Sequence, residues 1–216
     1  MKKLVNNNLY NLYNHPKVTA HIWDIIRASP EYFPIGILIY FIMIPSPQIL
    51  FLFIMSLMVL FSNLGFKMLI FKPLYRLAGN DYLPLIGRGS RPNGAIDCST
   101  FIKCNQKLST SFGMPSGHAQ FGWWLVGFFL PLIWESYEYK DEDFLKPTEQ
   151  KTYVKILQTI GVIVLALVIC YSRVYVEKCH TIQQVVVGSI IGVGYGYFTY
   201  WLYRLFIRRG IIRAKF

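Results

Sequence analysis

The chain has 216 residues, of which 54% are hydrophobic and only 15% are charged. Soluble domains carry about 25% charged residues, so this composition argues against an ordinary water-soluble fold. The formal net charge of +11 is typical of proteins that bind nucleic acid, anionic lipid headgroups or an anionic substrate. Nucleic acid fits least well, because the basic residues are scattered between apolar blocks and form no continuous run.

The basic N-terminus is not followed by the apolar core of a signal peptide, so we expect no cleavable leader. Residues 18–31 mix isoleucine and tryptophan with Asp24 and Arg27, a pattern that suits an amphipathic helix at a membrane interface. A helix near the membrane without an interfacial role fits the pattern about as well. We assign residues 1–32 to this N-terminal interfacial segment.

Long blocks without charge follow, and their lengths predict membrane-spanning helices, which need about 20 apolar residues each. Residues 33–66 carry no charged side chain, but Pro45 and Pro47 divide them into a short segment and a full-length one. The short segment is either a span or a tilted, re-entrant or interfacial helix. Residues 67–110 form a loop outside the membrane. The five predicted spans cover residues 33–44, 48–66, 111–134, 156–172 and 181–203.

The predicted fold class is therefore an all-α, polytopic membrane bundle of five to six spans. It forms one domain over residues 33–208 and ends in a basic tail, 209–216. In the last span, Gly188, Gly192 and Gly196 recur at four-residue spacing, which lets helices approach closely in lipid. We favour packing within the bundle over dimerisation for this glycine face.

Three polar segments lie between the apolar blocks, and polar residues buried in a membrane protein usually serve a function. In chain order they cover residues 87–92, 114–118 and 172–180. The first lies within the loop 67–110 and the second directly follows that loop, and the chain then crosses the membrane twice before it reaches the third. All three therefore lie on the same side of the bilayer, so the sequence predicts that arginines, histidines and glycine-rich backbone converge there.

This set of residues suits phosphate chemistry. Arginine presents a planar, permanently charged fork that matches phosphate oxygens. Backbone N–H groups of Ser116 and Gly117 at a helix N-terminus also favour an anion. Two histidines divide the remaining tasks, since one attacks phosphorus and the other protonates the leaving oxygen. The alternative is that the arginines only extend toward lipid headgroups and the histidines have no special role.

The order of these motifs resembles the type 2 phosphatidic acid phosphatase (PAP2) family, which also contains the vanadium haloperoxidases. The residues that carry the resemblance are Arg91-Pro92, Pro115-Ser116-Gly117-His118, and Ser172-Arg173 followed by His180. The resemblance covers about residues 60–196 and implies a PAP2/haloperoxidase-like helical core. It also implies a phosphohistidine intermediate, with no metal and no other cofactor.

The resemblance implies a role for each of these residues. His180 is the nucleophile, and His118 is the general acid for the leaving group. The phosphoryl oxygens are held by Arg91, Arg173, Ser116 and the backbone of Gly117.

The chain departs from the family pattern in three places. The family has a lysine seven positions before the arginine of its Arg-Pro pair, where this chain has Pro84. We expect Lys67 and Arg88 to supply the missing charge, and Lys72 is an open alternative. The spacing between the third-segment arginine and the nucleophile is one residue longer than usual. The count of five spans is also one lower than in typical members.

Within the family, the dolichyl-diphosphatase branch is the most similar. Gln120 follows His118 by two places, as in that branch. Gln184 replaces the usual aspartate four residues after His180, on the same helix face, where its amide oxygen orients the imidazole.

The resemblance implies a membrane lipid as substrate, with a polyprenyl (dolichyl) diphosphate preferred. The alternatives are a phosphatidate or sphingoid-phosphate phosphatase, transfer of the phosphoryl group to an acceptor other than water, and a lipid-binding protein without turnover. The expected partners are the lipid substrate and the bilayer, not nucleic acid. The oligomeric state is open.

Basic residues are nearly balanced between the two membrane faces, so the positive-inside rule does not decide the orientation. The basic C-terminal cluster suits the cytosolic leaflet. That orientation places the active site in the lumen of the endoplasmic reticulum or another endomembrane compartment. Cys98, Cys104 and Cys179 lie on the active side, either as a disulfide and a thiol or as free thiols.

Overall fold

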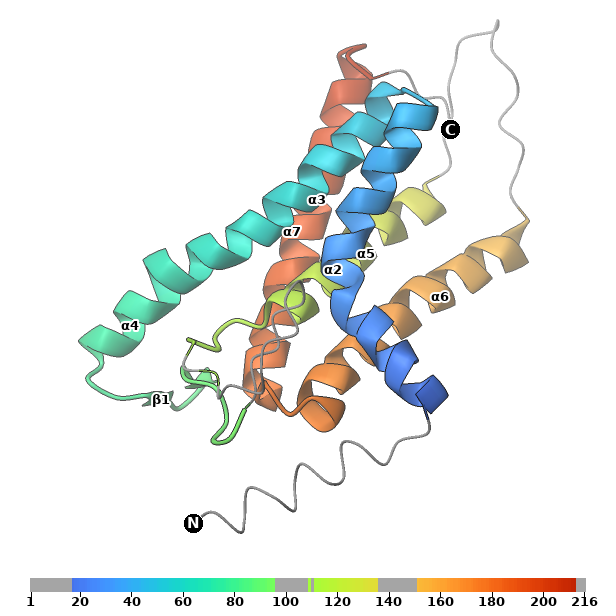
Figure 1. Ribbon diagram of the computed structural model, residues 1–216. Helices are drawn as coiled ribbons and strands as arrows, with labels where there is room; N and C mark the ends of the chain where they lie inside the picture. The colour runs from blue at the N-terminus through green and yellow to red at the C-terminus, as the bar shows by residue number, and fades with distance from the viewer. Residues whose placement is uncertain (1–16, 96–108, 110, 136–150, 213–216) are drawn as a thin grey trace, which may run out of the picture.

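The computed structural model describes residues 17–95, 109, 111–135 and 151–212, with only the backbone for residues 17–21 (Figure 1). The described residues form a helical bundle with one two-stranded hairpin, so the fold is all-α as predicted. The elements in chain order are α2 (Lys17–Met43), α3 (Pro47–Gly65), the π-helical turn η1 (Phe66–Phe71), α4 (Lys72–Leu77), β1 (Tyr82–Leu83), β2 (Gly87–Arg88), α5 (Gly117–Trp134), α6 (Thr152–Tyr171), the π-helical turn η2 (Ser172–Val176) and α7 (Ile182–Arg208).

Helix α2 joins two segments that the sequence analysis kept apart, the interfacial helix 18–31 and the short span 33–44. The expected boundary after residue 32 falls inside this helix. Pro30 lies in its middle and has no N–H to donate, and Ser29 donates its hydroxyl to the carbonyl of Ile26 at 2.8 Å instead. The two segments are therefore one continuous helix, and the Ser29 hydroxyl compensates for the missing N–H of Pro30.

Helix α3 also continues further than expected. Ser46 caps its start by accepting a hydrogen bond from the N–H of Ile49, at 3.3 Å. The helical path then runs through η1 and α4, so the loop predicted to begin at residue 67 begins after Leu77. Charged residues did not end the helix. It ends at Gly79, whose φ of +62° is the left-handed conformation that favours glycine after a helix.

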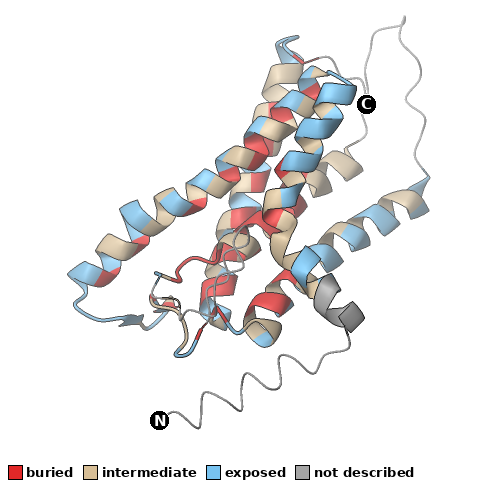
Figure 2. Ribbon diagram, viewed as in Figure 1, coloured by how far each residue is buried: buried red, intermediate tan, exposed pale blue. Residues whose placement is uncertain are grey.

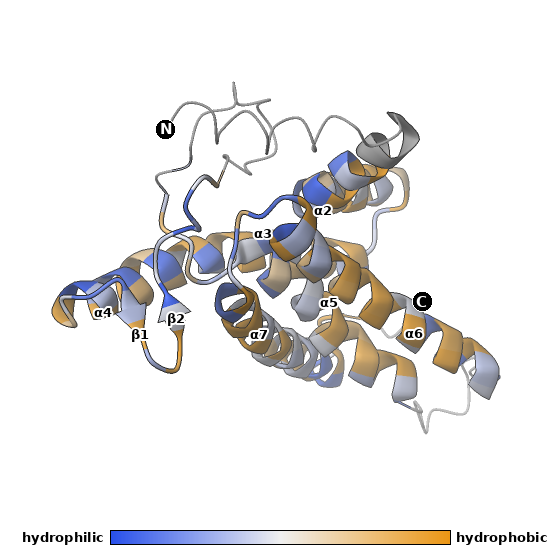
Figure 3. Cartoon of the chain, turned by 90° about the horizontal axis from the view of Figure 1, so that it is seen from below, coloured by the Kyte–Doolittle hydropathy of each residue, from blue (hydrophilic) through white to orange (hydrophobic). Residues whose placement is uncertain are grey.

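Four helices of the described part are long and apolar enough to cross a membrane, and the chain is a multi-pass membrane protein. These candidate spans are Ile22–Met43, Pro47–Leu77, Thr152–Val176 and Ile182–Arg208. Hydrophobic residues dominate α6, whereas hydrophilic residues gather around β2 (Figure 3). The remaining predicted span, α5, is the central helix, and it packs most extensively against α7 and α6. Buried residues lie mainly in α3, α5 and α7 (Figure 2).

The glycine face of α7 makes this close packing possible. A Cβ atom on Gly188 would lie 2.5 Å from the carbonyl oxygen of Ser116. A Cβ on Gly192 would collide with the carbonyl oxygen of Gln120 in α5. The glycine face therefore packs within the bundle, as predicted, and not against a second chain.

We expect Gly192→Ala to destabilise the protein by about 1–3 kcal/mol, because α5 must move away from α7 to admit the methyl group. Gly194→Ala is the matched control, since no atom lies within 4 Å of a Cβ at that position. Thermal unfolding in detergent micelles measures both variants. Equal melting temperatures would show that α5 and α7 do not pack as closely as the structure indicates.

Candidate active site

The three polar segments of the sequence meet at one end of the bundle, at the start of α5 and α7 (Figure 1). Backbone hydrogen bonds join them. The N–H of Gly113 donates to the carbonyl of Gly89 at 2.8 Å, and the N–H of Ser116 donates to the carbonyl of Gln184 at 3.0 Å. The convergence predicted from the number of membrane crossings is therefore present in the structure.

His180, the predicted nucleophile, is 4% exposed and lies just before α7. Its Nδ1 lies 3.0 Å from Oε1 of Gln184. The Gln184 amide nitrogen donates to the carbonyl oxygens of Arg88, at 2.8 Å, and Ser90, at 2.7 Å. Because these two bonds use the N–H₂ end, the amide presents its oxygen to the ring. Nδ1 of His180 therefore carries the proton, and Nε2 keeps the lone pair that a nucleophile needs.

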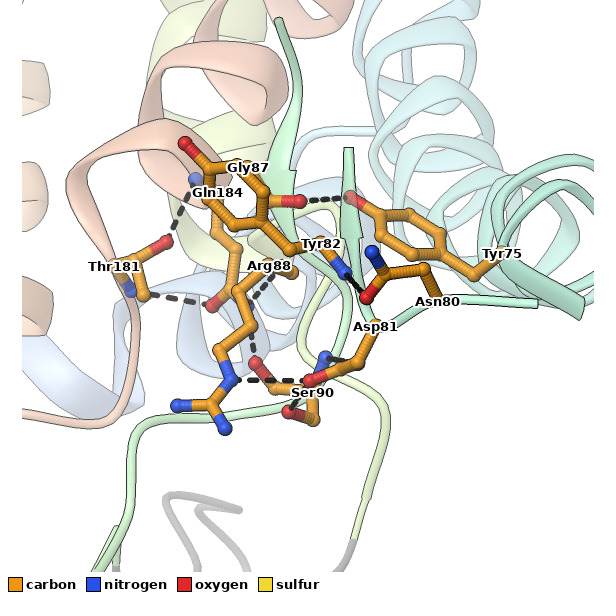
Figure 4. A network of polar contacts seen from close by, with 9 residues as sticks. All are labelled: Tyr75, Asn80, Asp81, Tyr82, Gly87, Arg88, Ser90, Thr181 and Gln184. Carbon is orange, nitrogen blue, oxygen red and sulfur yellow. Dashed lines mark hydrogen bonds and ion pairs between the residues drawn. The ribbon is translucent and has the colours of Figure 1, made fainter. Parts of the chain in front are cut away.

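A capping box places Gln184 in this position. The Thr181 hydroxyl accepts from the N–H of Gln184 at 3.3 Å, and Oε1 of Gln184 accepts from the N–H of Thr181 at 3.2 Å (Figure 4). The sequence analysis missed this motif, although the threonine followed three places later by glutamine was a visible signal. Gln184 therefore both caps the start of α7 and lies within hydrogen-bond distance of the histidine ring.

Three cations surround the histidines. Lys67 on η1, Arg91 after β2 and Arg173 on η2 each interact electrostatically with both His118 and His180. Nε of Arg91 donates to the Ser111 hydroxyl at 2.8 Å, and its Nη1 donates to the carbonyl of Cys179 at 3.4 Å. Through these contacts the guanidinium of Arg91 links the residues before α5 to the segment that contains His180.

The surroundings of His180 lower the pKa of its imidazole well below the ordinary value. Burial is the main cause, because it disfavours the charged ring, and Arg91, Arg173 and Lys67 add repulsion. The hydrogen bond with Gln184 opposes these effects only in part. The imidazole is therefore neutral, and able to attack, at neutral pH.

We expect the acid limb of the kcat/KM profile to lie below pH 6.5, the ordinary pKa of histidine. Activity is lost as the pH falls through the pKa of His180, so a change that raises this pKa moves the limb to higher pH. Arg91→Gln removes one of the repelling cations and is expected to do so. Arg208→Gln, at the far end of α7, is the control that leaves the limb in place. Identical limbs in wild type and Arg91→Gln would contradict the assignment.

Ser116 and Gly117 lie where α5 begins, as the sequence predicted for phosphate ligands. The Ser116 hydroxyl is fully buried, and no described residue hydrogen-bonds to it, so it is free to donate to a phosphate oxygen. A Cβ on Gly117 would lie 2.9 Å from Oδ1 of Asn63. Asn63 in turn donates to Oε1 of Gln120 at 2.8 Å, so glycine is required for α3 to approach this turn. The local sequence gives no signal for this contact, because Asn63 and Gln120 are 57 residues apart in the chain.

His118, the predicted general acid, has its Nε2 2.8 Å from the backbone carbonyl oxygen of Arg27 in α2. A carbonyl oxygen only accepts, so Nε2 carries a proton here. Helix α2 therefore lies against the site, which the sequence analysis did not foresee because it placed this segment at the interface.

Arg173 is 1% exposed and forms an ion pair with Glu177, one helical turn later. The four-residue spacing was a readable signal for this pair, which the sequence analysis missed. Glu31 of α2 also interacts electrostatically with Arg173. Arg173 lies on the π-helical turn η2, and π-helical turns occur frequently at functional sites.

Arg88 has a different partner from the one expected. Its side chain is 44% exposed and donates from Nε to Asp81 at 3.0 Å (Figure 4). Its backbone carbonyl accepts a hydrogen bond from the Gln184 amide nitrogen, and Gln184 in turn contacts His180. Of the two residues expected to replace the family lysine, Lys67 interacts electrostatically with the histidines, whereas the Arg88 side chain pairs with Asp81.

Cys179 is buried, while Cys98 and Cys104 lie outside the described residues. Within the described ranges, no three histidine, cysteine, aspartate or glutamate residues lie together as ligands of a metal ion would. The charges that face the histidines come from lysine and arginine.

Comparison with known proteins agrees with the motif order. The family model described as the PAP2 superfamily matches residues 49–208. No curated protein and no solved structure shows a significant match. The matched range includes every site residue predicted from the sequence, from Lys67 to Gln184. The chain therefore belongs to the PAP2 superfamily.

Proposed function

We propose that this protein is a membrane lipid phosphatase that works through a phosphohistidine intermediate. The observation that carries the proposal is the environment of His180. Gln184 contacts Nδ1 of the ring and leaves the Nε2 lone pair available, and the ring interacts electrostatically with Lys67, Arg91 and Arg173. This arrangement suits attack on an anionic phosphoryl group. Preorganised positive charge is the main source of catalysis in phosphoryl transfer.

The reaction has two steps. Nε2 of His180 attacks the terminal phosphorus and the bond from that phosphorus to the leaving oxygen breaks, where the leaving oxygen is the bridging oxygen of a lipid diphosphate or the ester oxygen of a lipid monophosphate. His118 gives a proton to the leaving oxygen. Water then attacks the phosphohistidine and gives a proton to His118, the phosphorus–nitrogen bond breaks, and phosphate is released with both imidazoles restored. Lys67, Arg91, Arg173, Ser116 and the Gly117 backbone hold the phosphoryl oxygens in both steps. Arg88 acts through its backbone rather than its guanidinium.

The substrate is a phosphorylated lipid whose tail stays in the bilayer. The site lies at one end of a bundle with four long apolar helices, and α5 is proposed as a further span. We favour a polyprenyl (dolichyl) diphosphate, because Gln120 and Gln184 stand where the dolichyl-diphosphatase branch has glutamine. We place the active site on the lumenal side of the endoplasmic reticulum or another endomembrane, with the basic C-terminal end in the cytosol.

The test is phosphate release by the full chain in detergent micelles with EDTA present. Polyprenyl diphosphate, phosphatidate and sphingosine phosphate are offered in parallel, and Glu135→Gln, at the far end of α5, controls for nonspecific damage. Preferential release from the polyprenyl diphosphate supports the dolichyl-diphosphatase branch. Preferential release from phosphatidate or sphingosine phosphate would reject that branch and identify the other lipid as the substrate. Lipid binding without release from any substrate, by folded protein, would reject the phosphatase and indicate a non-catalytic lipid-binding protein.

A further inference from the structure

Asp81 lies outside the apolar helices, directly before β1, and is the centre of a polar network beside the site (Figure 4). Its carboxylate accepts hydrogen bonds from the backbone N–H of Ser90, at 2.8 Å, from the Ser90 hydroxyl, and from Nε of Arg88, at 3.0 Å. Its backbone carbonyl also accepts from the N–H of Gly89 at 2.9 Å. One acidic residue thus binds three consecutive residues of the segment that leads to Arg91.

The opposite side of the same segment orients the nucleophile. The carbonyl oxygens of Arg88 and Ser90 are the two acceptors of the Gln184 amide nitrogen. Gln184 in turn presents its oxygen to Nδ1 of His180. Asp81 therefore holds the backbone groups that decide which end of the Gln184 amide faces the imidazole.

We propose that Asp81 is a positioning residue, which acts through the Arg88–Ser90 backbone and Gln184 to keep His180 in its nucleophilic tautomer. The kinetic part of this inference rests on the proposed function. Without the carboxylate, the two carbonyl acceptors are no longer held together. The Gln184 amide is then free to turn its N–H₂ group toward the ring, which favours a proton on Nε2, and a ring with that proton has no lone pair there for phosphorus.

The carboxylate is ionised at neutral pH, which suits this role. Burial alone would raise the pKa of Asp81, but the hydrogen bonds from Ser90 and Arg88 outweigh it and lower the pKa below the ordinary value. The ion pair with Arg88 is half-exposed on both sides, at 44% and 46%, so its own contribution to stability is small. Loss of Asp81 is therefore expected to affect the site far more than the fold.

The kinetic test is a double-mutant cycle with Asp81→Ala, Gln184→Ala and the double variant. We expect Asp81→Ala to lower kcat about tenfold to a hundredfold, as small misplacements of reacting groups do. If Asp81 acts through Gln184, its removal has little further effect in the Gln184→Ala protein. Asp81→Asn keeps an oxygen acceptor and is expected to recover part of the activity. Glu135→Ala, another half-buried carboxylate with an arginine partner, is the control that keeps full activity.

A second readout does not depend on turnover. Protein labelled with ¹⁵N-histidine reports whether Nδ1 or Nε2 of His180 carries the proton, and the His180→Ala spectrum assigns the signals. We expect the Nδ1–H form in the wild type and in Glu135→Ala, and a gain of the Nε2–H form in Asp81→Ala. An unchanged tautomer in Asp81→Ala, or additive losses in the cycle, would overturn the positioning role. Absence of phosphate release with the expected tautomer shift would reject the phosphatase and leave the positioning role intact.

Discussion

His180→Ala is expected to lower phosphate release from the preferred lipid by at least about 10³-fold, because no other group takes over attack on phosphorus. The described histidines other than His180 do not share its position: His118 directs Nε2 to a backbone carbonyl of α2. Initial rates in micelles, with the lipid in excess, measure the loss. The effect falls on kcat, since the phosphate ligands remain.

Two further measurements separate chemistry from folding for this variant. The melting temperature in micelles shows whether loss of the buried ring has unfolded the protein. Free imidazole added to His180→Gly fills the vacated position, and we expect it to restore part of the turnover by accepting the phosphoryl group itself. Residual release above a tenth of the wild-type rate in His180→Ala would rule out the phosphohistidine mechanism.

Arg173→Met is expected to reduce both activity and stability, for different reasons. The guanidinium is 1% exposed and paired with Glu177, whose side chain is 12% exposed. Removing the guanidinium leaves the Glu177 carboxylate buried without its counter-charge, which costs about 3–5 kcal/mol of folding stability. Activity falls by about 10²-fold or more, because a ligand of the transferring phosphoryl group is lost.

The double variant Arg173→Met/Glu177→Leu distinguishes the two effects. It removes both charges, so we expect stability to return to near the wild-type value while activity stays low. Denaturation in micelles and phosphate release, measured on the same preparations, give the comparison. Recovery of activity in the double variant would mean that Arg173 serves only to neutralise Glu177.

The main features of the fold and site were predictable because they follow from simple periodic and topological rules. The apolar blocks located the helices, since each needs a minimum length to cross a bilayer. Counting two crossings between His118 and His180 placed both histidines on one face, and the glycine face of α7 indicated packing against a neighbouring helix. Each of these inferences depends only on the order and spacing of residues.

The failures share a different cause. The start of the uncharged block after residue 32 was interpreted as a boundary, although α2 continues through it from Lys17 to Met43. Arg88 was interpreted as a phosphate ligand, although Asp81, seven residues earlier, forms its ion pair. In both cases several arrangements were compatible with the local sequence, and only the folded chain shows which one is adopted.

By itself, the sequence determined the class of protein, the membrane helices, the family and the residues available for phosphate chemistry, because composition and spacing carry that information. Only the tertiary structure decided which charge faces which group. It brought Lys67 to the histidines, gave Arg88 to Asp81, and set α2 against His118. The physical reason is that hydrogen bonds and ion pairs act over a few ångströms, and the chain neighbours of a residue do not reveal which distant groups come within that range.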